Sequence, residues 1–233
     1  MTPRNIRYMD WSHIPVASYV FFGLFVALSL VHLVFCFLEK ELARKITKCP
    51  GTLCLFVAAV IAVPTEPLVY LGLFFGLLGD FCLLKKHKVW PFICGTVSFL
   101  IGHILYIAMF IRLCGELHYA YFVGTGLWVI LFPILFVRLA KTIVHQKKLI
   151  VIGCIYFSLL TLDLIWAIIA CAHGCLDYVL LSAFGAVCFI ISDSFLTRTM
   201  FKKDVKRRDF YIMSTYLLAQ GLIIVGFVMT LLK

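Results

Sequence analysis

Eight long apolar runs follow one another along this chain of 233 residues, separated by short polar or charged segments. A helix of about 17 to 25 predominantly apolar residues crosses the hydrocarbon core of a bilayer. We therefore expect an all-α polytopic membrane protein whose single domain covers residues 1–233. The expected spans are 18–38, 50–64, 68–84, 90–111, 120–137, 149–171, 178–197 and 210–232.

Composition supports this interpretation, because 64% of the residues are hydrophobic and 14% are charged. Ordinary soluble domains are roughly half apolar and about a quarter charged, so a water-soluble fold and a disordered chain are both excluded. The formal net charge of +10 does not indicate a nucleic-acid partner, because the basic residues form short clusters between the apolar runs. We expect membrane lipids as partners and no nucleic acid.

The basic residues also predict orientation, since Lys and Arg near the ends of spans stay on the cytoplasmic side. The first, third, fifth and seventh connections carry four, three, four and six of the 21 Lys and Arg residues, and the other side carries four. This alternation predicts an even number of spans with both termini lumenal or extracellular.

Ten cysteines and seven histidines do not indicate a metal site, because they form no CxxC, HxxxH or HExxH motif. We expect neither a metal nor a cofactor. Cys114, Cys171 and Cys175 fall near the non-cytoplasmic side, where an oxidising compartment permits a disulfide among them.

Three acidic residues lie inside the expected spans: Asp80, Asp163 and Asp193. A charged side chain at the centre of a membrane helix costs at least about 2.5 kcal/mol, so each is a functional candidate. Gly72 and Gly76 precede Asp80 at intervals of four, which lets another helix approach that face closely. Asp163 lies among bulky apolar residues and is expected to make only a polar contact with a neighbouring helix.

Asp80 and Asp193 are expected at matched depths, because each precedes a basic residue, Lys85 or Arg198, by five residues, or roughly 7 to 8 Å. Two carboxyls that meet in a membrane repel each other, which keeps one protonated and provides an acid and a base. Which residue is the acid stays open. Small and aromatic residues also lead to Asp193 along one stripe of its span: Ser182, Gly185 and Phe189.

Further polar residues are expected near these acids. Tyr216 and Gln220 lie one turn apart, and Tyr216 is close to the depth of Asp80 and Asp193. His103 and Tyr106 share a face of span 90–111. His103 lies roughly 20 Å from the cytoplasmic boundary, which we expect to be too deep for contact with the two carboxylates.

Four sequence blocks resemble the YhhN-like integral membrane proteins, a family that includes the animal lysoplasmalogenases. The blocks are Gly79-Asp80-Phe81-Cys82-Leu83, Gly102-His103-Ile104-Leu105-Tyr106, Phe189-Ile190-Ile191-Ser192-Asp193, and Ile212-Met213-Ser214-Thr215-Tyr216 followed by Ala219-Gln220. Lys48-Cys49-Pro50 is similar to the family's opening of the second span.

The resemblance implies hydrolysis of the vinyl ether bond of a lysophospholipid substrate, a lysoplasmalogen, by two intramembrane aspartates, Asp80 and Asp193. It also implies that Ser192, Tyr216 and Gln220 orient the water or the ether oxygen. His103, Tyr106 and Lys85 complete the expected substrate-binding residues, and the Lys and Arg of the third and seventh connections would hold the phosphate. The family implies an endoplasmic reticulum membrane.

Other classes of protein remain alternatives. A proton- or ion-coupled transporter also uses intramembrane acids and glycine seams, and Asp163, His103 and His32 would favour it. Intramembrane aspartyl proteases carry a GxGD motif, but Leu77 stands where its first glycine would be. A scaffolding protein would need neither Asp80 nor Asp193. The oligomeric state is open, with a homo-oligomer among the alternatives.

Overall fold

The structure, a computed structural model, describes residues 14–85, 89–115, 117, 119–140, 147–173, 176–201 and 206–232. Within these ranges, the side chains of residues 85, 89, 135–140, 147–152, 176–177 and 198–201 lie outside the description.

The described residues form eight α-helices and a short 3₁₀ helix, with no strand among them. They are α1 (Val16–Phe37), α2 (Glu41–Ala62), α3 (Pro67–Cys82), η2 (Leu83–Lys85), α4 (Val89–Cys114), α5 (Tyr119–Ala140), α6 (Lys147–Ala172), α7 (Leu176–Phe201) and α8 (Arg208–Leu231). The all-α prediction is therefore confirmed, and all helices except α2 begin and end within four residues of their expected spans.

The second helix differs from its expected span, because α2 begins at Glu41 and contains Pro50 in its interior. The prediction that Lys48, Cys49 and Pro50 open this helix is wrong. Hydropathy does not reveal the first turns of α2, where Arg44 and Lys48 contact carboxylates of other helices. Pro50 has no backbone N–H, so the carbonyl one turn earlier lacks its helical donor. In a membrane protein, donors on neighbouring helices can satisfy such a carbonyl.

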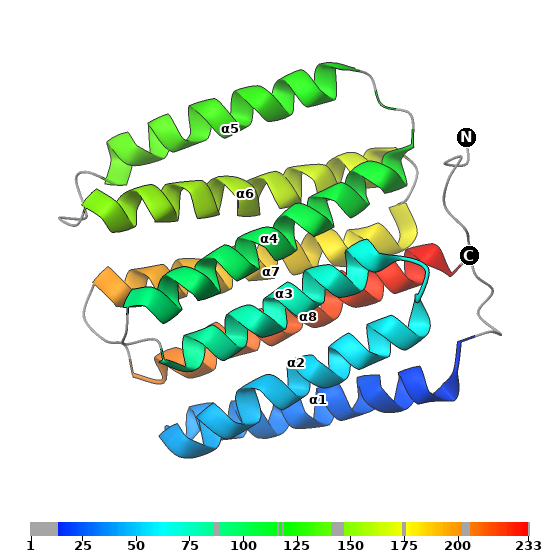
Figure 1. Cartoon of the computed structure of the whole chain (residues 1–233), viewed down its shortest axis with the longest axis vertical. Helices are drawn as coiled ribbons and strands as arrows, with labels where there is room; N and C mark the ends of the chain where they lie inside the picture. The colour runs from blue at the N-terminus through cyan, green and yellow to red at the C-terminus, as the bar shows by residue number, and fades with distance from the viewer. Residues whose placement is uncertain are drawn as a thin grey trace.

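The helices run up and down, so that α1 begins and α8 ends at the same end of the bundle (Figure 1). Helices α1, α3, α5 and α7 end, and α2, α4, α6 and α8 begin, at the opposite end (Figure 1), which we call the basic end because the sequence between these helix ends is rich in Lys and Arg. This arrangement agrees with an even number of spans. The assignment of the basic end to the cytoplasm stays a prediction.

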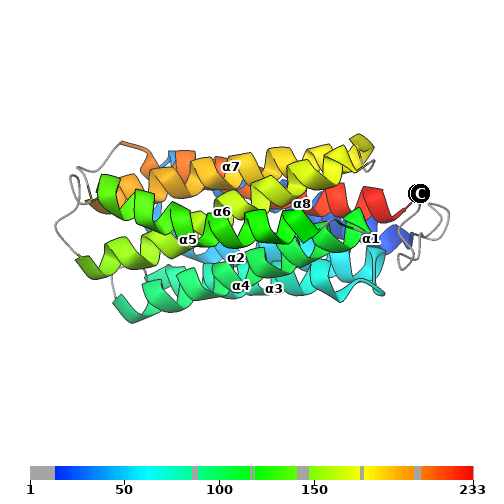
Figure 2. The same ribbon diagram turned by 90° about the horizontal axis from the view of Figure 1, so that it is seen from above.

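Three helix pairs pack most extensively: α1 with α2, α3 with α4, and α7 with α8. Helix α6 contacts α4 and α7, and α5 packs on α6 at one edge of the bundle (Figure 1). Seen from above, α7 lies on one face and α3 and α4 lie on the other (Figure 2). The interior between these layers receives side chains from several helices.

Glycines allow the closest approach between α7 and α8. A Cβ atom at Gly226 would lie 2.2 Å from the Oγ of Ser182 and 2.7 Å from its backbone nitrogen. One at Gly185 would lie 2.9 Å from the carbonyl oxygen of Ala219. Ser182 also donates a hydrogen bond to the Ile223 carbonyl across the same interface, at 3.0 Å. Small residues thus bring the two backbones into contact.

We expect Gly226→Ala to destabilise the protein by roughly 1–3 kcal/mol, because the added methyl group forces α7 and α8 apart. Gly23→Ala is the matched control, since a Cβ there has no neighbour within 4 Å. Thermal unfolding in detergent should show a lower midpoint for the Gly226 variant and no loss for the Gly23 variant. Equal midpoints for the two would contradict this packing.

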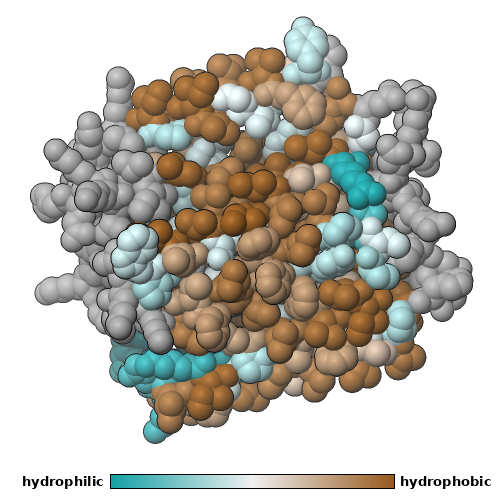
Figure 3. Space-filling view, viewed as in Figure 1, coloured by the Kyte–Doolittle hydropathy of each residue, from teal (hydrophilic) through white to brown (hydrophobic). Residues whose placement is uncertain are grey.

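In the part of the chain that the structure describes, six helices are long and apolar enough to cross a membrane by length and composition: α1, α2, α4, α6, α7 and α8. Helix α3 (Pro67–Cys82) and the Tyr119–Ile134 part of α5 are apolar over a shorter length. Brown, hydrophobic surface covers most of the space-filling view between the grey ends (Figure 3). These observations describe an all-α polytopic membrane protein.

Candidate active site

Asp80 lies near the end of α3, and its carboxyl group contacts three donors from two other helices. Lys48 Nζ is 3.1 Å from Oδ1, Thr52 Oγ1 donates to Oδ2 at 3.1 Å, and Tyr216 Oη donates to Oδ2 at 2.6 Å. The Asp80 side chain is 1% exposed and that of Lys48 is 15% exposed. Three donors, one of them a cation, suit an ionised carboxylate.

The expected close approach of other helices along the Gly72–Gly76–Asp80 face of α3 is confirmed. A Cβ atom at Gly72 would lie 2.4 Å from the Tyr106 ring of α4, and one at Gly76 would lie 3.1 Å from Gln220 Nε2 of α8. The two glycines therefore make room for the side chains of Tyr106 and Gln220 against this face of α3.

These polar side chains continue the contacts of Asp80 toward α4. Gln220 Nε2 donates to Tyr216 Oη at 3.3 Å, and Tyr106 Oη donates to Gln220 Oε1 at 3.5 Å. Tyr106, Tyr216 and Gln220 are all buried. The contacts form one chain of polar groups from Lys48 to Tyr106.

Asp193 on α7 is also buried, but its surroundings differ from those of Asp80. Among the described residues its only hydrogen bond comes from the Tyr156 hydroxyl of α6. No hydrogen bond joins Asp193 to Asp80 within that part of the chain, yet the charges of His103, Asp80 and Lys48 all act on Asp193. The two acids are electrostatically coupled, and of the two only Asp80 contacts a cation among the described residues.

Aromatic rings pack around the polar residues. The Phe189 ring centroid lies 5.5 Å from that of Tyr216, 4.4 Å from that of His103 and 6.0 Å from that of Phe99. Phe189 precedes Asp193 by one turn of α7. The rings give the acids a largely apolar setting, in which contacts between charges are strong.

His103 contacts a carboxylate other than the two expected catalytic ones. Its Nδ1 lies 3.0 Å from Asp163 Oδ2, and the two side chains are 2% and 1% exposed. The interpretation of Asp163 as a contact to a neighbouring helix is thereby confirmed. Asp163 Oδ1 and Trp166 Nε1, one turn apart on α6, are buried without a hydrogen-bond partner among the described residues.

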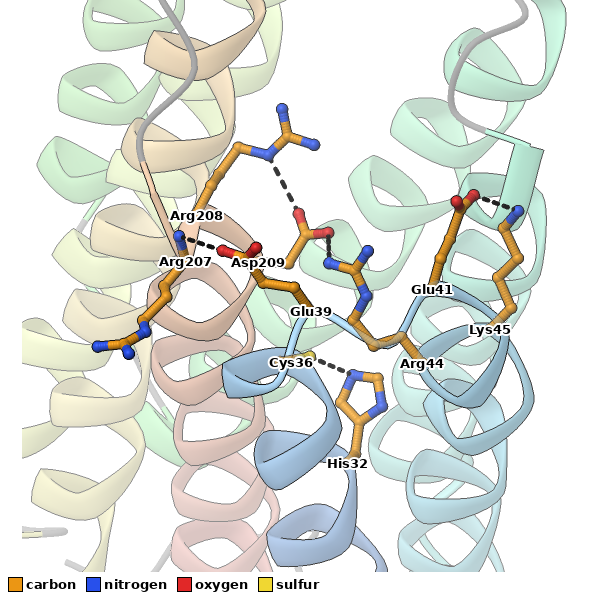
Figure 4. Close-up of polar contacts among 9 residues, drawn as sticks. All are labelled: His32, Cys36, Glu39, Glu41, Arg44, Lys45, Arg207, Arg208 and Asp209. Atoms are coloured by element: carbon orange, nitrogen blue, oxygen red, sulfur yellow. Dashed lines mark hydrogen bonds and ion pairs between the residues drawn. The ribbon is translucent and has the colours of Figure 1, made fainter.

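At the basic end, arginines join the first and last connections (Figure 4). Arg44 of α2 and Arg208 of α8 both contact the carboxylate of Asp209, and Glu39 accepts a hydrogen bond from the backbone N–H of Arg207 at 3.1 Å. Of these arginines, Arg207 contacts Glu39 and the Phe37 ring, and Arg208 contacts its neighbour Asp209 within α8.

Two other expected site residues receive less support from geometry. Ser192 donates its hydroxyl to the Ile212 carbonyl at 3.0 Å, which gives it a contact between α7 and α8. The side chain of Lys85 lies outside the described residues. Cys175 lies outside them too, so the disulfide among Cys114, Cys171 and Cys175 stays a prediction.

Sequence reasoning missed Lys48, Thr52 and Tyr156. Lys48 counted as an orientation signal in a loop, although Thr52 follows it at helical spacing and shares its face of α2. Tyr156 and Asp163 are seven residues apart, so both lie on one face of α6. No pattern within α6 shows that Tyr156 faces Asp193 of α7.

The opposite end of the bundle holds one further buried acid, Glu66, in the connection between α2 and α3. Arg112 Nη1 of α4 donates to its Oε2 at 2.7 Å, and the Glu66 side chain is 3% exposed. Burial raises the pKa of Glu66, while the positive charge of Arg112 acts in the opposite direction. This contact ties the α2–α3 connection to the end of α4.

No curated protein and no solved structure matched this chain significantly. A model of the YhhN family matches residues 43–227, a segment that begins in α2, ends in α8 and includes every residue around Asp80 and Asp193. Because the match covers most of the sequence, the chain belongs to the YhhN family.

Proposed function

We propose that this chain is a lysoplasmalogenase of the endoplasmic reticulum membrane. It would hydrolyse the sn-1 vinyl ether bond of alkenyl-glycerophosphoethanolamine or alkenyl-glycerophosphocholine. The products would be a fatty aldehyde and glycerophosphoethanolamine or glycerophosphocholine. Family membership supports a hydrolase of this kind. The observation that carries the proposal is the pair of buried, coupled carboxyls with unequal surroundings.

The unequal surroundings assign a role to each acid. Asp80 faces the Lys48 ammonium and two hydroxyl donors, so it serves as the carboxylate. Asp193 has one neutral donor, Tyr156, and no cationic contact among the described residues, so it carries the proton. One residue type thereby provides both the acid and the base.

Enol ethers hydrolyse through protonation at carbon. Asp193 gives its proton to the second carbon of the alkenyl chain, which leaves a positive oxocarbenium ion on the first carbon and the ether oxygen. The Asp80 carboxylate stabilises this cation and takes a proton from the water that attacks the first carbon. The product of these steps is a neutral hemiacetal, with Asp80 protonated and Asp193 ionised.

Collapse of the hemiacetal restores both acids. Asp80 returns its proton to the sn-1 oxygen as the carbon–oxygen bond breaks, and Asp193 takes the hydroxyl proton of the hemiacetal. The aldehyde and the glycerol hydroxyl leave, and no proton is gained or lost overall. Tyr216 and Gln220, in contact with Asp80, position the water, and Tyr106 holds Gln220.

The remaining expected residues take supporting roles in this proposal. His103 lies against Phe189 and keeps its contact with Asp163, so it shapes the wall of the substrate site. Ser192 fixes α7 on α8 beside Asp193. Lys85 remains a proposed contact for the headgroup.

The function is tested by aldehyde release from 1-alkenyl-lysophosphatidylethanolamine by the purified chain in detergent. An ester-linked lysophosphatidylethanolamine of the same length is the control, because its carbonyl carbon cannot be protonated in this way. We expect release of aldehyde from the alkenyl lipid and no fatty acid from the ester. A folded protein that releases no aldehyde would refute the proposal.

A proton-coupled transporter is the second candidate, and the buried His103–Asp163 pair is the observation that favours it. In proteoliposomes with an imposed pH gradient, a transporter would move protons in a manner that depends on Asp163. A lysoplasmalogenase would leave the gradient unchanged while releasing aldehyde.

A further inference from the structure

Two basic residues on α2 lead from the basic end of the bundle to Asp80. Arg44 and Lys48 are four residues apart, so their side chains leave the same face of the helix about one turn from each other. Arg44 contacts Asp209 of α8, and Lys48 contacts Asp80 of α3. Two ion pairs are therefore stacked along α2, the outer one at the basic end.

Exposure falls from the outer pair to the inner pair. The side chains of Arg44 and Asp209 are 22% and 20% exposed, whereas those of Lys48 and Asp80 are 15% and 1% exposed. Both side chains of the outer pair are partly exposed. A charged group that enters from the basic end therefore meets Arg44 before it approaches the acids.

Two arginines share the carboxylate of Asp209. Arg208 Nε also contacts Asp209, at 3.1 Å from Oδ1, so two guanidinium groups share one carboxylate (Figure 4). Asp209 can therefore stay on Arg208 when another anion, such as a phosphodiester, takes its place on Arg44.

We propose that Arg44 binds the phosphate of the lysolipid substrate, with Lys48 one turn deeper. This inference rests on the proposed function and names the headgroup subsite of the same site. A guanidinium can donate two parallel N–H bonds to phosphate oxygens, which a lysine cannot do. Arg44 is therefore the specific anchor and Lys48 the link to Asp80.

The spacing of the two pairs fits the substrate. The glycerol backbone separates the sn-3 phosphate from the sn-1 oxygen by a span comparable to one helical turn of about 5.4 Å. A phosphate on Arg44 places the vinyl ether at the depth of Lys48 and Asp80. The alkenyl chain then continues toward the apolar rings beside Asp193.

Binding of two saturated analogues tests this subsite without any hydrolysis: 1-O-alkyl-lysophosphatidylethanolamine and the phosphate-free 1-O-alkylglycerol. The full chain is purified in a maltoside detergent, which carries no phosphate. We expect Arg44→Gln to raise the Kd of the phosphate analogue about tenfold or more. Asp209→Asn should lower that Kd, because the competing carboxylate is gone. The Kd of the alkylglycerol should change little in either variant.

Lys45→Gln is the matched control. Lys45 adjoins Arg44 in sequence but pairs with Glu41 on the surface, with side chains 51% and 64% exposed. It should leave the Kd of both analogues unchanged. Thermal unfolding of each variant shows that it is folded.

The opposite effects of Arg44→Gln and Asp209→Asn separate a phosphate subsite from a purely structural ion pair, which would suffer equally from either change. The inference is overturned if Arg44→Gln binds the phosphate analogue like the wild type, or if Asp209→Asn weakens binding as Arg44→Gln does. These outcomes can be read even if the wild type releases no aldehyde. Conversely, if the wild type releases aldehyde and Arg44→Gln binds the phosphate analogue normally, the subsite proposal is wrong and the proposed hydrolase function still holds.

Discussion

Asp193→Asn is expected to lower kcat for lysoplasmalogen hydrolysis by about 10²–10⁴-fold, because the alkenyl carbon loses its proton donor. The amide has nearly the same shape, and its oxygen can still accept the hydrogen bond from Tyr156. The variant should therefore remain folded with little change in substrate binding. Aldehyde release under saturating substrate, beside thermal unfolding of the same preparation, measures both properties.

Ser194→Ala is the matched control for this variant, because Ser194 adjoins Asp193 but bonds the Ile190 carbonyl of its own helix on an exposed face. Its kcat should equal that of the wild type. Asp80→Asn should lose activity to a similar extent, and it should also lower stability, because Lys48 loses its carboxylate partner. A folded Asp193→Asn protein that keeps more than a tenth of the wild-type kcat would contradict the assignment of the acid.

Asp163→Leu is expected to destabilise the protein by roughly 3–5 kcal/mol, because it leaves the buried His103 imidazole without its partner. His103→Leu should have a comparable effect. The double variant should lose less free energy of unfolding than the sum of the two single losses, because neither polar group is then buried without its partner. Thermal unfolding in detergent measures all three.

Thr125→Val provides the control for these variants, because Thr125 is partly exposed on α5 and, among the described residues, its hydroxyl bonds the Tyr121 carbonyl of its own helix. It should unfold at the wild-type temperature. If Asp163→Leu unfolded at that temperature too, the His103–Asp163 pair would have no structural role, and the transporter alternative would gain support.

The sequence correctly predicted those features that depend on one face of a single helix. The intervals of four between Gly72, Gly76 and Asp80 predicted a close helix contact, and α4 and α8 make it. Tyr216 was expected near the acids from its depth alone, and its hydroxyl bonds Asp80. Hydropathy is enough for such predictions, because the bilayer fixes the length and the depth of each helix.

Contacts that depend on the relative position of two helices were harder to predict. His103 and Asp163 lie on α4 and α6, and no pattern within either helix shows that their faces meet. Lys48 was obscured for another reason, because a charge near a span is usually an orientation signal. Only the continuation of α2 beyond its apolar run places Lys48 beside Asp80.

The most direct test of the central claim is the position of deuterium in the aldehyde that the wild-type chain releases in D₂O. Protonation of the alkenyl chain by an Asp193 that has exchanged with solvent predicts one deuterium on the second carbon of the aldehyde, trapped at once as its hydrazone. Aldehyde released without deuterium on that carbon would show that the bond breaks by another route, and the proposed roles of Asp80 and Asp193 would be wrong.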